Sequence, residues 1–247
     1  MKFIHVAALL IVALCQAFSA EIADPHKVFI TATESLEAGD PDNAVERYEE
    51  LVDADWHSPE LYHNYAVALQ RQGDTNAALL QLYRAWLLNP FSNTAKSQFL
   101  NQAKEASLSN TRLSQAESQA AALAWHPHLA LGALALFWTS LILIILVRKP
   151  LVRGFGFSGV AIGLLLGAAA YYFHQAAPKA NSAWIISPEA RPLRASHGKG
   201  SPQLTTASPL TQVAIRNERE DWIYVQRDNG SGGWVDEASV AKLMPWR

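Results

Sequence analysis

Two apolar runs, Leu129–Val147 and Gly154–Phe173, dominate the hydrophobic pattern in the middle of the chain. Neither contains a charged residue. Each is about 20 residues long, the length of helix that crosses a hydrocarbon core of roughly 30 Å. Because a chain inside lipid must satisfy its own backbone hydrogen bonds, the pattern predicts two transmembrane helices, at 129–147 and 154–174. The short segment 148–153 joins them, so a helical hairpin is expected.

Before these runs, apolar residues recur at three- and four-residue spacing, which predicts amphipathic helices. Part of this pattern repeats after 34 residues: Ala38-Gly39-Asp40 returns as Gln72-Gly73-Asp74, and Ala44 returns as Ala78. The glycine allows the chain to turn, and the aspartate can cap the helix that follows. The repeat therefore predicts two successive helix–turn–helix units.

These units place a helical domain at 25–106, with repeats at about 25–58 and 59–92 and a capping helix at 93–106. A cap is expected because two repeats alone leave an apolar end exposed. Residues 107–128 are rich in Ala, Gln and Ser and predict a polar helical linker that leads into the first span.

The repeats resemble the tetratricopeptide repeat (TPR), a family of paired helices. In the second unit, the residues at the family's large, small, glycine, alanine and proline positions are Tyr62, Tyr65, Ala66, Leu69, Gly73, Ala78, Leu82, Ala85 and Pro90. The first unit keeps Gly39, Ala44 and Tyr48 and departs from the family pattern at Thr31, Ala32 and Trp56. The resemblance implies a solenoid with a concave groove for a peptide or a partner helix.

By position in the family motif, the groove residues would be Phe29, Thr33, Leu36, His63, Val67 and Gln70. TPR domains that grip a terminal carboxylate carry Lys and Asn at the first two of these positions. Phe29 and Thr33 stand there instead, so that ligand is not expected. Two interpretations remain open for Phe29 and Leu36: they line the groove, or they belong to the core.

Beyond Pro178 the pattern changes to short period-two runs rich in β-branched and aromatic residues, with Pro and Gly between them. Asp228-Asn229-Gly230 suits a tight hairpin turn. The pattern predicts a small all-β barrel at 182–246. The candidate strands are 183–186, 211–215, 221–226, 233–235 and 241–244.

The motifs of this barrel resemble the bacterial SH3 family, in which a Trp-x-x-Val strand is followed by a hairpin and then by Gly-Trp-Val. Here these are Trp222–Val225 and Gly233-Trp234-Val235, and 190–194 stands where the family has its Val-Arg run and loop. The resemblance implies an interaction module or a cell-wall-binding module. Trp222 and Trp234 are either an aromatic binding face or residues that define the fold.

Gly159, Gly163 and Gly167 lie four residues apart on one face of the second span. In lipid, small residues allow helices to approach closely. The stripe therefore predicts packing against the first span, or alternatively contact with another subunit. Amphipathic residues of the kind found at headgroup depth flank both runs: Trp125, His126, His128, Tyr171, Tyr172, Phe173 and His174.

Charge predicts the side of the membrane. Arg148, Lys149 and Arg153 lie between the spans, and cationic loops stay in the cytoplasm. Both soluble domains are therefore expected on the extracytoplasmic, periplasmic side of a bacterial inner membrane. The layout of residues 1–20 is that of a secretory signal peptide. The alternative is an uncleaved anchor.

The remaining composition excludes several classes of function. The chain has 247 residues, a net charge of −2 and one cysteine, Cys15. With no basic stripe, nucleic-acid binding is not expected. The acidic stretch 21–60 is interpreted as a solvated helix face rather than a cation-binding patch. Motifs for catalysis, a metal or a cofactor are lacking, so a non-enzyme without cofactor is expected.

The order of signal, TPR, two spans and SH3-like domain resembles the BatE-like proteins of the Bat (aerotolerance) system. That resemblance implies a scaffold in an envelope complex linked to stress or oxygen tolerance. Its partners would be von Willebrand factor A-type membrane proteins and, indirectly, a MoxR-type ATPase. Two alternatives are a peptidoglycan-binding protein and a transmembrane sensor, for which the short turn 148–153 offers little signalling surface.

Overall fold

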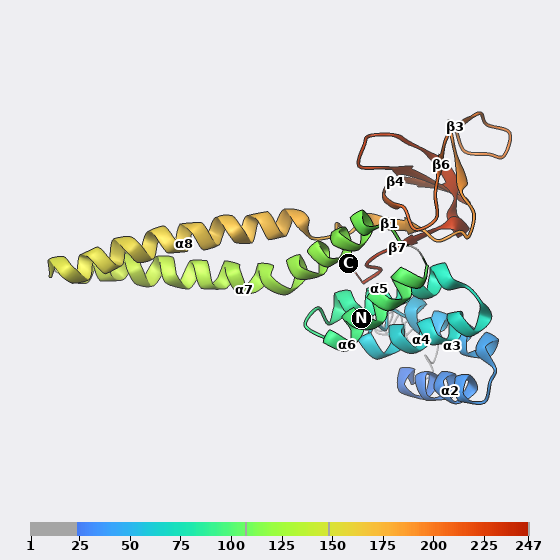
Figure 1. Ribbon diagram of the computed structural model, residues 1–247, viewed down its shortest axis with the longest axis horizontal. Coiled ribbons are helices and arrows are strands. Elements are labelled where there is room, and N and C mark those ends of the chain that lie inside the picture. Colours follow the sequence, from blue (N-terminus) through green and yellow to red (C-terminus); the bar gives the residue numbers. More distant parts are fainter. Residues whose placement is uncertain (1–23, 107, 148, 247) are drawn as a thin grey trace, which may run out of the picture. The chain divides into compact units, whose positions relative to one another are not determined.

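The computed structural model describes residues 24–106, 108–147 and 149–246 (Figure 1). The expected signal peptide, 1–20, and Arg148 of the expected cytoplasmic turn lie outside these residues. The described chain forms two compact units, one that ends at His57 and one that begins at Ser58.

The first unit is a pair of helices, α2 (Pro25–Glu37) and α3 (Pro41–Asp53). Each begins at a proline, which is already set for the first helical turn, and each is preceded by a capping aspartate. Gly39 has a φ of +83° between the two helices, a conformation that glycine adopts without steric cost. The residues buried in this pair are Val28, Ala32, Leu36, Ala44, Tyr48 and Leu51.

The second unit starts with the same arrangement in α4 (Pro59–Gln72) and α5 (Thr75–Leu88), followed by α6 (Asn93–Glu105). Gly73 has a φ of +89°, and the Asp74 carboxylate accepts a hydrogen bond from the Ala77 N–H at 3.0 Å. The helix, turn and helix predicted from each repeat are thus present, and α6 occupies the segment where a cap was expected.

Two long helices follow, α7 (Asn110–Leu146) and α8 (Pro150–Ala176), which lie side by side as a hairpin (Figure 1). The expected linker and first span form one continuous helix rather than two elements. Pro127 lies inside α7 and removes a backbone donor there. This accounts for the change of direction of α7 along its length in Figure 1.

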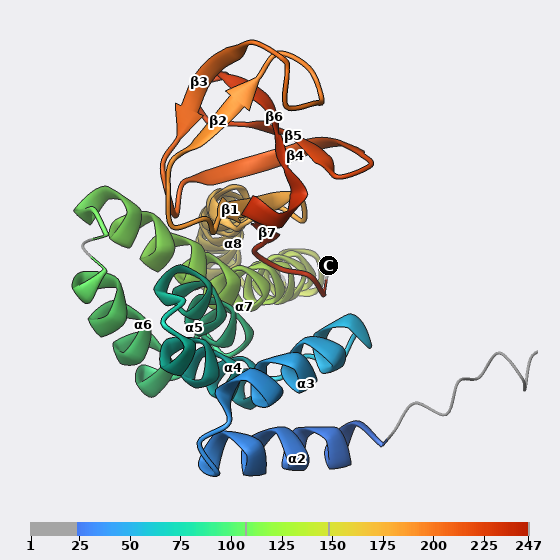
Figure 2. The same ribbon diagram turned by 90° about the vertical axis from the view of Figure 1, so that its right-hand side faces the viewer.

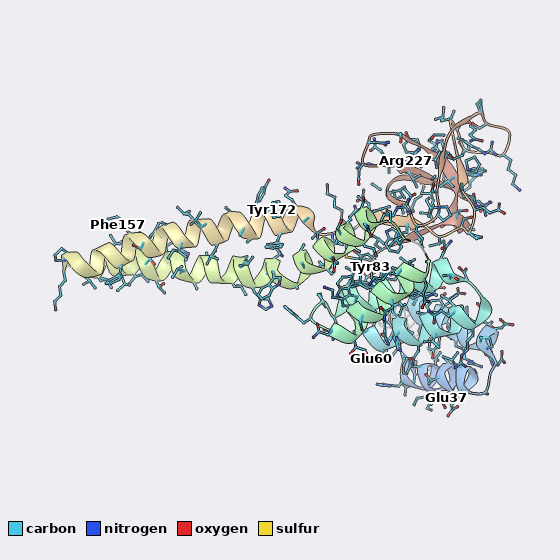
Figure 3. All side chains as sticks on the ribbon, in the orientation of Figure 1. Glu37, Glu60, Tyr83, Phe157, Tyr172 and Arg227 are labelled. Atoms are coloured by element: carbon cyan, nitrogen blue, oxygen red, sulfur yellow. The ribbon has the colours of Figure 1, made fainter. Side chains whose placement is uncertain are left out.

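The surface of this hairpin is apolar. Leu146 and Leu165 are exposed by 74% and 70%, and Phe157 and Tyr172 extend away from the two helices (Figure 3). In the described residues, α7 and α8 are the helices long and apolar enough to cross a membrane. Large apolar side chains at this exposure need a covering medium, and lipid is one that matches the helix length.

The C-terminal part is an antiparallel sheet in the order β3-β2-β6-β5-β4-β1-β7 (Figure 2). A 3-10 helix, η1 (Glu237–Ser239), precedes β7. The strands are β1 (Ser182–Ile185), β2 (Arg191–Arg194), β3 (Gln203–Ala207), β4 (Gln212–Arg219), β5 (Trp222–Gln226), β6 (Gly232–Asp236) and β7 (Val240–Lys242). The sequence did not predict β3, an edge strand whose side chains are mostly exposed and therefore lack the apolar alternation.

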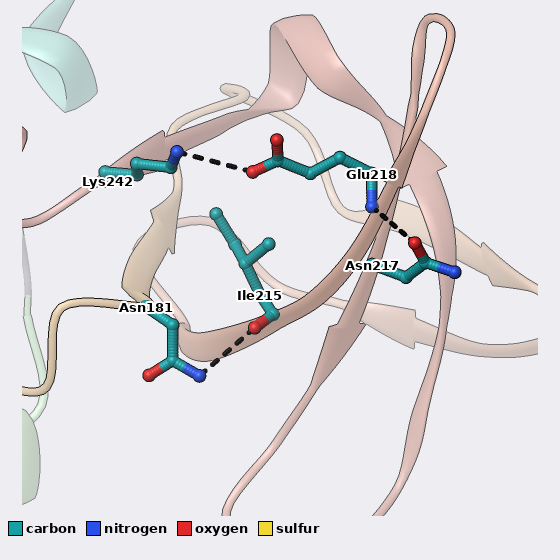
Figure 4. A network of polar contacts seen from close by, with 5 residues as sticks. All are labelled: Asn181, Ile215, Asn217, Glu218 and Lys242. Carbon is teal, nitrogen blue, oxygen red and sulfur yellow. Dashed lines mark hydrogen bonds and ion pairs between the residues drawn. The ribbon is translucent and has the colours of Figure 1, made fainter.

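Polar contacts hold β4 and β7 around β1. The Asn181 amide donates to the Ile215 carbonyl at 3.1 Å, and Lys242 forms an ion pair with Glu218 at 3.3 Å (Figure 4). The sheet is filled by one apolar cluster: Ala183, Ile185, Leu193, Ala207, Val213, Ile215, Ile223, Val225 and Val235.

This barrel does not stand apart from the helices, because β1 buries side chains in both directions. Ala183 and Ile185 belong to the barrel core, whereas Trp184 belongs to a second core that includes residues of α4, α5, α6 and α7. The Trp184 ring stacks on Tyr83 with ring centroids 5.0 Å apart and planes 3° from parallel. Helices and barrel in this unit therefore share a hydrophobic core.

Polar groups complete this shared core. Burial raises the pKa of the Tyr83 phenol, which stays protonated and donates to Gln119 at 2.6 Å. Arg84 is 7% exposed, and its guanidinium donates to the Lys242 carbonyl of β7. Burial lowers the pKa of Arg84, and the Tyr62 ring lies 5.5 Å from its guanidinium carbon. These contacts compensate the desolvation of the buried groups.

We predict that Trp184→Ala lowers the free energy of unfolding by about 3–5 kcal/mol, since it removes a ring shared by two packed parts. The measurement is denaturant unfolding of the detergent-solubilised chain, followed by circular dichroism of the helices. Trp222→Ala is the control, because Trp222 is half-buried outside both apolar clusters and should cost about 1 kcal/mol. Equal midpoints for the two variants would contradict the shared core.

Candidate functional site

An aromatic surface covers part of the outer side of the barrel. Strand alternation places Ile223 and Val225 in the core, so Trp222 and Tyr224 project outward, and both are half-buried. On the neighbouring strand, Trp234 pairs with Tyr224, and their rings meet edge to face with centroids 5.6 Å apart. Such a surface presents flat apolar rings to a ligand.

A loop completes this surface. The His197 ring, from the loop between β2 and β3, meets Trp234 edge to face at 5.7 Å. Arg194 pairs with Trp234 across β2 and β6, and its guanidinium donates to the Ser201 carbonyl at 2.7 Å, which ties both ends of the loop together. We define the barrel aromatic face as His197, Trp222, Tyr224 and Trp234.

Close packing of two strands supports this face. A Cβ at Gly233 would lie 2.8 Å from the Leu193 Cβ and 2.9 Å from the Arg194 carbonyl oxygen. Glycine is therefore needed where β6 crosses β2. The motif residue Gly233 allows the strands to approach closely, while the next residue, Trp234, supplies a half-buried ring on the outer side.

A second candidate site is a polar cleft of about 330 Å³ between the first half of α7 and the barrel. Gln119 connects its two walls, since its amide donates to Gln212 at 3.1 Å. In a neighbouring pocket of about 230 Å³, which Gln119 also lines, Arg112 of α7 donates to the Pro209 carbonyl and to Thr211, at 2.8 and 3.0 Å. These side chains offer hydrogen bonds to a ligand, but they already join helix and barrel.

The expected groove residues of the first helical pair lie at the α2–α3 contact. The Phe29 ring packs 5.5 Å from Trp56 and 6.1 Å from Tyr48. The Thr33 hydroxyl lies 3.1 Å from the Tyr48 hydroxyl, and Leu36 is 5% exposed. Of the two interpretations left open by the sequence, this packing favours a core role for Leu36, while Phe29 and Thr33 remain half-buried.

The expected groove residues of the second pair lie on one face of α4. Gln70 is exposed, and His63 and Val67 are half-buried. The Nδ1 atom of His63 is buried without a hydrogen-bond partner in the described part of the chain. Partner binding by these three residues stays a prediction.

The glycine stripe of α8 faces α7 over part of its length. A Cβ at Gly159 would collide with the Ser140 hydroxyl, and one at Gly163 would lie 3.2 Å from the backbone nitrogen of Phe137. Gly156, which the sequence did not single out, is also close, with the Ile144 Cγ1 2.6 Å from an added Cβ. Three glycines thus permit the close contact of the two helices.

Gly167 differs from the other predicted positions. The nearest atom to an added Cβ is the Ala133 Cβ at 4.0 Å, an ordinary contact distance. Gly167 also borders an apolar groove of about 670 Å³ between α7 and α8. Spacing alone did not distinguish it from Gly159 and Gly163, because the two helices diverge toward that end.

In the described residues, no group of three or more His, Cys, Asp or Glu side chains is placed to hold a metal ion. The aromatic face and the polar cleft both supply surfaces for binding, through stacking and hydrogen bonds.

Comparison with known proteins bears on the barrel. Residues 190–241 match the family model of the bacterial SH3 domain. A search of curated proteins found no match. A search of solved structures also found none. The match covers β2 to β6 and most of β7, and it leaves β1, with Trp184, outside.

Sequence reasoning identified Trp222 and Trp234 but missed Tyr224 and His197. The signal for Tyr224 was present, because a residue two positions after Trp222 in a strand lies on the same side of the sheet. His197 gave no such signal, since it enters the face from a loop whose path the pattern does not specify.

We predict that Gly163→Ala weakens the hairpin by about 1–3 kcal/mol, because the added methyl group meets backbone that cannot rotate away. The matched control is Gly167→Ala, where the methyl group has room. Thermal unfolding in one detergent, with cross-linking between cysteines placed on α7 and α8, compares the variants. Equal thermal midpoints and cross-linking yields would refute the close contact at Gly163.

Proposed function

We propose that the chain is a non-catalytic adaptor, anchored in the membrane by α7 and α8, that binds a partner through its bacterial SH3 domain. One observation carries the proposal: the domain that matches this family has half-buried aromatic rings on its outer side. The helices pack elsewhere on the barrel, on Trp184 of β1, and leave these rings accessible. Aromatic side chains that are partly accessible in this way are enriched at protein-binding surfaces.

The helical pairs support a second binding surface. Their turns at Gly39 and Gly73, with capping Asp40 and Asp74, agree with the TPR-like pattern of the sequence. We propose that the outer residues of α4, above all Gln70 and the half-buried His63 and Val67, contact a peptide or helix of a partner. Leu36 acts as a core residue in this proposal.

The partner class follows from the domain order. A TPR-like region, two apolar helices and an SH3-like barrel, in this order, resemble BatE-like proteins. The proposed partners are accordingly von Willebrand factor A-type membrane proteins and, through them, a MoxR-type ATPase. In this hypothesis the chain is a scaffold of an envelope complex linked to stress or oxygen tolerance.

The sidedness belongs to the same proposal. The basic residues between the helices, Arg148, Lys149 and Arg153, favour a cytoplasmic turn, which would leave both soluble parts outside the cytoplasm. The match to a bacterial SH3 domain supports a second candidate function, peptidoglycan binding, because an outward aromatic ring also suits the apolar side of a sugar ring.

We predict that a photoreactive phenylalanine analogue in place of Lys199, which is exposed in the loop of His197, captures the partner in native membranes. Trp234→Ala should reduce the adduct severalfold, because it removes the central ring, and Trp234→Phe should retain most of it. The same analogue at Glu105, exposed on α6, is the off-face control.

Mass spectrometry of the adduct separates the two candidate functions. A membrane-protein adduct supports the adaptor, whereas a muropeptide adduct supports wall binding. A yield at Lys199 that is no higher than at Glu105, and does not respond to Trp234→Ala, would reject the barrel aromatic face as a binding surface.

We predict that Ser118→Cys and Ser231→Cys, each in a Cys15→Ser background, both react with a membrane-impermeant maleimide added outside spheroplasts. Ser118 is exposed on the first half of α7, and Ser231 lies in the turn before β6. Leu151→Cys, in the segment 148–153 that the sequence places between the two spans, should react only after lysis. Labelling of Ser118→Cys or Ser231→Cys only after lysis would overturn the proposed orientation.

A further inference from the structure

An exposed aromatic residue stands in the connection between α5 and α6. Phe91 is 58% exposed, although the chain on both sides of it is fixed. The Ser92 N–H donates to the Asn89 carbonyl at 3.0 Å, and the Ser92 hydroxyl accepts from the Ala95 N–H at 3.2 Å as the cap of α6. A large apolar ring held outward by an ordered loop indicates a contact surface.

Phe91 meets two residues that are distant in sequence. Its ring packs edge to face on Trp125 at 5.8 Å and lies 6.0 Å from the ring of His128. Trp125 is itself 52% exposed, and His128 is exposed. We call these three residues the loop–helix aromatic cluster.

The position of the cluster along α7 sets its depth. Trp125 precedes Leu129, the first residue of the apolar run, by four residues, or about 6 Å along a helix. The headgroup region on each face of a bilayer is roughly 5–8 Å thick. A hairpin that spans the bilayer therefore places Trp125 and His128 at headgroup depth, and Phe91 with them.

The end of α8 lies at the same level. The rings of His126 and His174 are 5.0 Å apart across the hairpin, and Tyr171 and Tyr172 beside them are exposed by 66% and 71%. Aromatic side chains of both helices thus gather at one end of the apolar surface, as in an interfacial belt. Phe91 joins this belt from the loop between α5 and α6.

We propose that the α5–α6 loop rests on the membrane and inserts Phe91 at the boundary between phospholipid headgroups and acyl chains. The occupant of this surface is lipid, because Trp125 and His128, which Phe91 contacts, come directly before the apolar run that begins at Leu129. The contact holds α4, α5 and α6 against the bilayer, in addition to their covalent connection to α7. This inference rests on the proposed membrane anchoring of α7 and α8.

The test uses the full chain, with Cys15→Ser, in nanodiscs of zwitterionic phospholipid. A nitroxide attached at Asn93→Cys, exposed at the start of α6, reports collisions with dissolved oxygen and with a water-soluble nickel chelate. With Phe91 present, we expect oxygen collisions to predominate. Phe91→Ser should raise the nickel collision rate severalfold, since the loop leaves the interface, and Phe91→Trp should leave it unchanged.

Two reference positions separate the possible failures. A nitroxide at Leu165→Cys, 70% exposed on α8, must be accessible to oxygen and shielded from nickel; otherwise the membrane anchor itself is wrong. A nitroxide at Ser114→Cys, about 22 Å before Leu129 along α7, reports the water phase. If Leu165→Cys is buried in lipid but Asn93→Cys matches Ser114→Cys and ignores Phe91→Ser, the anchor stands and the loop contact is refuted. The loop contact with lipid is also refuted if Asn93→Cys stays shielded from nickel both in the Phe91→Ser variant and in protein free of lipid. The shielding group would then be a neighbouring part of the protein.

Discussion

The stacking of Tyr83 on Trp184 is the contact on which the larger unit depends. It joins a helix of the repeat-like region to the first strand of the barrel, in a core where neither ring is open to water. Arg84, next to Tyr83 in sequence, reaches the last strand through the Lys242 carbonyl. Two consecutive residues of one helix therefore hold both β1 and β7, the strands at one end of the sheet order.

This contact changes how the barrel is to be understood. The family match starts at residue 190, after β1, yet β1 lies between β4 and β7 in the sheet. Its side chains alternate between the barrel core and the helical core. A fragment cut at the family boundary would lose β1 and its pairing with both β4 and β7. A fragment cut between the helices and β1 would expose Trp184, Leu243 and Met244 to water. The folding unit is the barrel together with the helices that share its core.

Much of the fold was predictable because local chemistry specifies it. Glycine and aspartate at the turns, proline at helix starts and period-two strands are short-range features, and the helices and most strands formed where they predicted them. The docking of the barrel was not predicted, since it joins residues some 100 positions apart in sequence, as Tyr83 and Trp184 are. One local feature did indicate this docking. The segment 183–186 is apolar at every position, a pattern typical of strands that are buried on both faces.

The site was predictable to a smaller extent. Trp222 and Trp234 belong to motifs that can be read along the chain, whereas His197 and Phe91 come from loops, and loop paths follow from packing elsewhere. The glycine stripe shows the same limit. Its spacing is uniform, but the close approach is at Gly156, Gly159 and Gly163, because distance between helix axes varies along a crossing pair.

The connection from α8 to the barrel is short, and this restricts where the aromatic rings can operate. Only residues 177–181 separate Ala176 from Ser182, a path of at most about 20 Å when fully stretched. Arg112 and Gln119 also hydrogen-bond the barrel to α7. The barrel is therefore attached to both helices, covalently to α8 and by hydrogen bonds to α7, and does not move as a freely linked domain. In the proposed membrane-anchored adaptor, a partner of the barrel aromatic face therefore has to reach the bilayer surface.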